Sequence, residues 1–71
     1  MKRRFEFVQG TSAKFYEVAV AGNAVSVTFG RIGTSGQTQT KQFASRADAQ
    51  KHADKQVAHK LKKGYVEQVA A

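Results

Sequence analysis

Apolar and polar side chains alternate along the first half of the chain, as they do in strands that bury one face. Residues 3–9 and residues 14–21 both follow this pattern. The run from Val25 to Phe29 continues it after Gly22-Asn23, a pair that favours a two-residue hairpin turn. Residues 37–43 are polar but contain two threonines, so they predict a fourth strand with a solvated face.

The second half of the chain predicts one helix over residues 46–63, which contain neither glycine nor proline. Ser45 is a suitable N-cap, and Asp48 three residues later suits the positive end of the helix dipole. Gly64 fits the position after the C-cap, and residues 65–67 predict a short extended segment. An apolar stripe with a spacing of four residues would face the sheet. Its members are Ala49, Ala53, Val57 and Leu61.

The order of these elements predicts an α+β fold in a single domain over residues 1–71. Consecutive strands joined by short turns pair as antiparallel neighbours. We therefore expect a small antiparallel β-sheet of four to five strands with one α-helix packed across it. The alanines of the stripe imply that this helix approaches the sheet closely.

Basic residues outnumber acidic ones by 12 to 5, which gives a net charge of +7 and a pI of about 10.2. Such a charge indicates an anionic partner, and nucleic acid, anionic lipid and an acidic protein all remain open. The alternative is that the positive charge serves only solubility and has no specific partner. No apolar run approaches the roughly 18 residues of a membrane span, and there is no cysteine. We expect a cytoplasmic protein that is not inserted in a membrane.

The segment from Phe29 to Gln37 carries three glycines at a spacing of three, with Arg31 between the first two. Glycine permits positive φ and close approach of the backbone, so this is a shaped turn that holds an arginine beside an aromatic ring. Such an arginine can bind a phosphate, and the aromatic ring can stack on a flat sugar or base. Lys14 opens the second strand beside two more aromatics. Phe29 also suits a core position, and Arg31 a solvated loop.

The helix carries two further groups of basic residues. Lys51, Lys55 and Lys62 fall on one side of a helical projection, opposite the alanine stripe. Most such faces are simply solvated, and the functional alternative is a secondary surface that tracks phosphates. In the last turn, Lys60, Lys62 and Lys63 favour the negative end of the helix dipole.

No arrangement of residues predicts catalysis, a metal site or a bound cofactor. His52 and His59 are seven residues apart, whereas a helical zinc pair is usually four apart. The five carboxylates are scattered along the chain. The glycines follow the pattern Gly-x-x-Gly-x-x-Gly, which differs from the phosphate-binding motifs Gly-x-Gly-x-x-Gly and Gly-x-x-x-x-Gly-Lys-[Ser/Thr]. In this chain they also connect two strands, whereas those motifs open a helix. We therefore do not expect an enzyme.

Several segments together resemble the WGR domain, a module named for the sequence Trp-Gly-Arg. The resemblance runs from about Ala13 to Glu67. It rests on Lys14-Phe15-Tyr16-Glu17-Val18, Phe29-Gly30-Arg31-Ile32-Gly33, Gly36-Gln37, Lys41-x-Phe43, the alanine-rich helix and Lys60-x-x-Lys63-Gly64-Tyr65.

WGR domains occur in DNA-dependent poly(ADP-ribose) polymerases, where they bind DNA near a break, and in bacterial proteins similar to molybdate metabolism regulators. By this resemblance Phe29 takes the place of the motif tryptophan that packs on a sugar at the 5′ end. Arg31 is then the motif arginine and Lys14 the lysine that contacts phosphate. Gln37 and Lys41, in the matched segments, complete the candidate nucleic-acid-binding set. The resemblance implies no catalytic residue.

Two functions of different classes follow. The favoured one is a non-catalytic nucleic-acid-binding module, with DNA as the preferred partner, directed to phosphates or 5′-phosphorylated ends and having little sequence specificity. The alternative is an accessory module that docks on an acidic partner protein.

Overall fold

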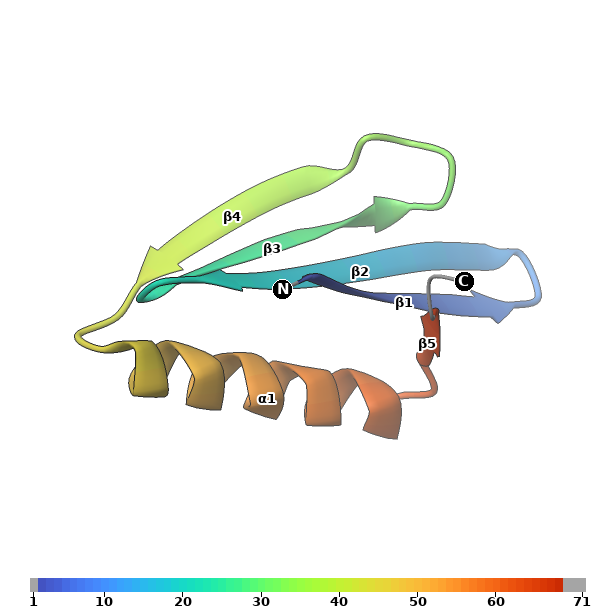
Figure 1. Cartoon of the computed structure of the whole chain (residues 1–71). Coiled ribbons are helices and arrows are strands. Elements are labelled where there is room, and N and C mark those ends of the chain that lie inside the picture. Colours follow the sequence, from blue (N-terminus) through green and yellow to red (C-terminus); the bar gives the residue numbers. More distant parts are fainter. Residues whose placement is uncertain (1, 69–71) are drawn as a thin grey trace.

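The computed structural model describes residues 2–68, which form a five-stranded antiparallel sheet with one helix across one face (Figure 1). The spatial order of the strands is β4-β3-β2-β1-β5. The elements are β1 (Lys2–Gln9), β2 (Ser12–Ala21), β3 (Ala24–Arg31), β4 (Gln37–Gln42), α1 (Arg46–Lys62) and β5 (Val66–Gln68). The α+β class predicted from the sequence is confirmed.

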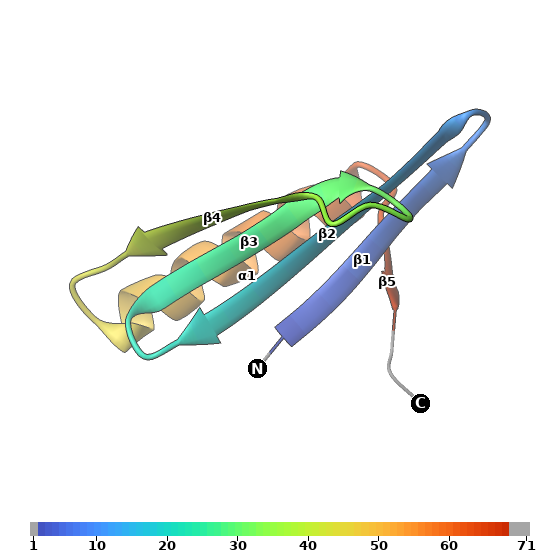
Figure 2. The ribbon, with the colours of Figure 1, turned by 90° about the horizontal axis from the view of Figure 1, so that it is seen from above.

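The core lies between α1 and the centre of the sheet, where the helix contacts β2 and β3 (Figure 2). The strand register places Phe5, Tyr16 and Phe29 side by side on the helix-facing side. Phe5 is completely buried, and burial of one such side chain contributes about 1.5–3 kcal/mol. The helix supplies small side chains to this contact, so its backbone can lie close to the strands. They are Ala49, Ala53 and Val57.

The predicted ends of the helix are confirmed. The Ser45 side chain accepts a hydrogen bond of 3.1 Å from the backbone N–H of Asp48, which satisfies one of the free donors of the first turn. At the other end Gly64 has φ of +102°. A side chain there would also come within 3.3 Å of the Phe7 ring. Glycine therefore allows the chain to turn from the helix into β5.

Leu61 does not belong to the buried stripe, contrary to the prediction, because 47% of its surface is exposed. A four-residue spacing advances by about 40° at each step around a helix with 3.6 residues per turn. By Leu61 the stripe has therefore rotated roughly 120° from Ala49. Lys60 lies closer to the sheet, where its ammonium is 4.8 Å from the centre of the Tyr16 ring.

The glycine-rich segment folds back over the other face of the sheet and buries Phe15 there. Phe15 is only 4% exposed, although it points away from the helix-facing core. A Cβ atom on Gly36 would lie 2.7 Å from the Phe15 ring and 2.5 Å from the Phe29 carbonyl oxygen. The Arg4 guanidinium covers the ring further, at 4.6 Å from its centre. Phe15 thus anchors the glycine segment to the sheet.

Arg4 also links two carboxylates on this face. It donates hydrogen bonds of 3.0 Å to Glu6 and 2.9 Å to Glu17. Lys2 lies 3.5 Å from Glu17. The hydrogen bond from Arg4 lowers the pKa of the Glu17 carboxyl below its ordinary value, and the charge of Lys2 lowers it further.

We expect the Glu17→Gln variant to lose part of the acid sensitivity of the fold, while the Glu67 carboxyl, whose pKa is lowered by the hydrogen bond from Arg3, retains its own part. Because the pKa of Glu17 is lowered in the folded state, its stabilising contribution is present above the ordinary glutamate pKa. It is lost as the pH falls through the lowered value. Unfolding by urea, followed by circular dichroism between neutral and acidic pH, measures the effect. Asp54→Asn is the control, because Asp54 forms no ion pair within residues 2–68. Equal acid sensitivity of wild type and Glu17→Gln would contradict the prediction.

Candidate nucleic-acid interface

Positive charge is distributed unevenly over the molecule. Three of the 12 basic residues, Lys2, Arg3 and Arg4, form all the ion pairs found within residues 2–68. Their partners are the three glutamates, which lie on β1, β2 and β5. The other nine basic residues have no such partner in the described part of the chain. They are Lys14, Arg31, Lys41, Arg46, Lys51, Lys55, Lys60, Lys62 and Lys63.

Four of these residues come together at one end of the helix. Lys14 of β2 pairs in register with Arg31 at the end of β3. Phe7, the neighbour of Lys14 on β1, contacts the turn at Gly64, so the last turn of α1 lies over this end of the sheet. We call Lys14, Arg31, Lys60 and Lys63 the basic cluster. It contains two of the three residues that the sequence placed at the centre of the site.

Two members of this cluster, Lys63 and Lys60, were not assigned to the site by the sequence analysis. Lys63 is exposed, whereas Lys60 is half-buried. The Lys60 ammonium lies 4.8 Å from the centre of the Tyr16 ring and 5.1 Å from that of Tyr65. Burial lowers the pKa of Lys60 below its ordinary value, and the charges of Lys63 and Lys14 lower it further. A signal existed in the sequence: Lys60 is seven residues after Ala53, which places it on nearly the same side of the helix.

Phe29 is half-buried beside the cluster. In register it lies between Tyr16 on β2 and Gln37 on β4. One part of its ring packs against the buried core, and another part lines an open groove. The two interpretations drawn from the sequence are therefore compatible, because the same ring contacts the core and faces solvent.

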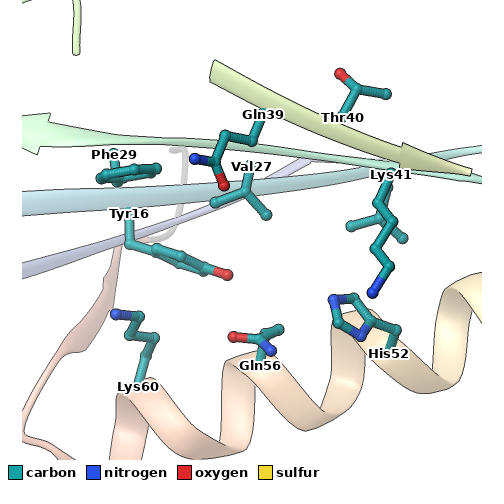
Figure 3. Close-up of a pocket in the computed structure, with 10 residues that line it drawn as sticks. Tyr16, Val27, Phe29, Gln39, Thr40, Lys41, His52, Gln56 and Lys60 are labelled. Atoms are coloured by element: carbon teal, nitrogen blue, oxygen red, sulfur yellow. The ribbon is translucent and has the colours of Figure 1, made fainter. Parts of the chain in front are cut away.

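The groove runs between α1 and the β3–β4 half of the sheet and has a volume of about 560 Å³ (Figure 3). Its floor is apolar and aromatic and is formed by Tyr16, Val25, Val27 and Phe29. Because α1 contacts β2 and β3, the outer strand β4 extends beyond the helix and leaves this space open.

Polar side chains form the two walls of the groove (Figure 3). Gln39 and Lys41 come from β4, and His52, Gln56 and Lys60 come from α1. The His52 ring packs against Phe43 at a tilt of 39°, with 4.9 Å between the ring centres, and the Lys41 ammonium is 5.5 Å from the centre of the Phe43 ring.

The remaining residues predicted for the site lie in three separate parts of the structure. Gln37 is exposed on β4, opposite Phe29 and close to the basic cluster. Lys41 lies opposite Val25, six residues along β3 from Arg31, which is about 20 Å in a strand. Lys51, Lys55 and Lys62 are exposed on the side of α1 turned away from the buried alanines, so they do not line the groove.

Within residues 2–68 no helix combines the length and the apolar composition needed to cross a membrane.

The five-stranded sheet, its single helix and the concentrated basic surface define a small α+β module. The chain belongs to the WGR domain family, whose model matches residues 1–71. This match confirms the resemblance seen in the sequence.

Relatives of known sequence or structure contain a similar segment within longer chains. Protein YehF of Escherichia coli (strain K12) is 44% identical over 66 residues, which cover 93% of this chain and 24% of that protein. Uncharacterized protein YfeS of the same organism is 39% identical over 67 residues, covering 94% and 28% respectively. This chain thus spans about a quarter of the length of both.

A crystal structure of a protein from Bacteroides fragilis superposes with a TM-score of 0.94 at 49% sequence identity. The match covers 97% of this chain and 20% of that one.

Proposed function

We propose that this module binds nucleic acid without catalysing a reaction, that its preferred partner is DNA, and that it is directed to phosphates at or near strand ends. One observation carries the proposal. The basic cluster has no carboxylate partner within residues 2–68 and lies beside the partly exposed ring of Phe29.

The composition of this surface suits the end of a DNA strand. A terminal phosphate carries more negative charge than an internal one, so it gains most from several cations close together. Arg31 can donate two parallel hydrogen bonds to a phosphate, and Lys14 adds a point charge. The exposed part of the Phe29 ring offers a flat apolar surface to the adjoining sugar. The WGR resemblance implies the same roles for these three residues.

We expect the module to show little preference for particular DNA sequences. Contacts to phosphates position a protein on a duplex but do not distinguish bases. On the outer side of α1 the long exposed side chains include Lys51, Lys55 and Lys62, which suit phosphates better than the edges of base pairs. We therefore propose that affinity depends on charge and on the presence of an end.

Fluorescence anisotropy of one labelled blunt duplex, with and without a 5′-phosphate and across a salt series, tests the proposal. The 5′-phosphorylated duplex should bind more tightly, and the logarithm of the affinity should fall by about 0.9 per phosphate neutralised for each tenfold rise in salt. Equal binding of the two duplexes would contradict the preference for a terminal phosphate. Absence of binding at low salt would favour an acidic protein as the partner, which a pull-down after nuclease treatment would detect.

A further inference from the structure

We propose that the groove between α1 and the β3–β4 half of the sheet takes one unpaired nucleobase of the bound strand. This inference rests on the proposed function and adds a preference to it, because contacts to phosphates alone do not require an unpaired base. The proposed substrate is a DNA end with a single-stranded nucleotide next to the duplex.

The first support is a pair of amide side chains that face each other across the groove. Gln39 projects from β4 and Gln56 from α1 (Figure 3). Neither side chain forms a hydrogen bond within residues 2–68. Each amide offers one acceptor and two donors, and the edge of a nucleobase presents the same two kinds of group. The two walls can therefore bind two edges of one planar ring.

The second support is the floor between these walls. Val27 and the Phe29 ring, both half-buried, present an apolar and aromatic surface to the space, and Tyr16 lines it with only 5% of its surface exposed. In Figure 3 the Tyr16 hydroxyl points toward Gln56, which adds a polar group at the rim of the floor. Bases that leave a stack are commonly held by aromatic contacts to their faces and hydrogen bonds to their edges. A volume of about 560 Å³ is within the usual range for a small-ligand site.

The third support is the charge at the two ends of the groove. Lys60 joins the groove to the basic cluster, and Lys41 lies toward the opposite end. No carboxylate of the described residues lines the space. The phosphate of an inserted nucleotide can contact Lys60 while its base lies over Val27. An acidic peptide would use the two lysines but leave the aromatic floor without a stacking partner, so the lining favours a nucleotide.

Three 5′-phosphorylated duplexes test the inference by anisotropy at one salt concentration. The first is blunt, the second has a 5′ overhang of one nucleotide, and the third has the same overhang without its base. The second and third carry the same charge, so they differ only in the base. We expect the base-bearing overhang to bind at least about fivefold more tightly than the abasic one, as for a stacked base.

The outcomes separate this inference from the proposed function. Equal binding of the two overhangs, with the blunt duplex also bound, would overturn the base site alone. Failure to bind any of the three duplexes would overturn both proposals.

Two variants then locate the site. Gln56→Ala should abolish the advantage of the base-bearing overhang, and Gln39→Ala provides a second test from the other wall. Gln50→Ala is the matched control, because Gln50 lies on the same helix but does not line the groove and instead donates to Asp54. Retention of the full advantage in both groove variants would overturn the assignment.

Discussion

The Lys14→Ala, Arg31→Ala double variant is expected to bind a 5′-phosphorylated duplex far more weakly than the wild type. Removal of each side chain proposed to bind a phosphate should reduce the affinity by about tenfold at 0.1 M salt. The slope of log affinity against log salt should fall by roughly 1.8 in magnitude. The reason is geometric: these two residues are paired in register at the end of the sheet and have no carboxylate partner within residues 2–68. Anisotropy across a salt series measures both quantities.

The matched control removes the same charge from a different surface. Lys51→Ala with Lys55→Ala leaves the net charge equal to that of the first variant, but both lysines are exposed on α1 and lie outside the groove. Their replacement should weaken binding only through the general reduction in charge. Equal decreases of affinity in the two double variants would disprove the location of the site at the basic cluster.

Gly36→Ala is expected to destabilise the fold strongly. Gly36 has φ of +71°, where alanine costs about 1–2 kcal/mol. The added Cβ would also lie 2.5 Å from the Phe29 carbonyl oxygen and 2.7 Å from the Phe15 ring. Such overpacking typically costs about 1–3 kcal/mol more. Because a loss of 1 kcal/mol lowers the melting temperature of a domain this small by about 4–8 °C, thermal unfolding should show a decrease of roughly 10 °C or more.

Gly10→Ala separates the two causes of this effect. Gly10 has a similar φ of +59°, but a Cβ atom there meets nothing within 4 Å. It should therefore show only the cost of the backbone conformation. If both variants lowered the melting temperature equally, the close packing of the glycine segment on Phe15 would not be the reason for glycine at residue 36.

The fold could be predicted well because its signals are local. The alternation around Phe5 and Val27 specifies strands, and Gly22-Asn23 specifies the turn between two of them. Ser45 and Gly64 mark the two ends of the helix through their own cap geometry. Each of these features depends on a few neighbouring residues, and the antiparallel order follows from the short connections.

The arrangement of the candidate site could be predicted only in part because it joins segments that are distant in the chain. Arg31 is predicted from the glycine segment, Lys14 from the aromatics beside it, and both from the family resemblance; the register brings the two together. The contribution of Lys60 depends on the rotation of α1 over the sheet, which a stripe with a four-residue spacing does not determine. The facing positions of Gln39 and Gln56 on the two walls of the groove depend on the distance between β4 and the helix.

The position of β5 has a consequence for how this module can be carried by a longer protein. The edge strand opposite β4 is β5, with β1 next to it, and Gln68 pairs with Arg4. Polypeptide joined to either end of residues 2–68 would therefore leave from the same side. A tether or neighbouring domain could attach there while the β4 side stays accessible. This arrangement fits a module that makes up about a quarter of the length of its relatives. The architecture is suited to insertion into longer chains without blocking its own groove.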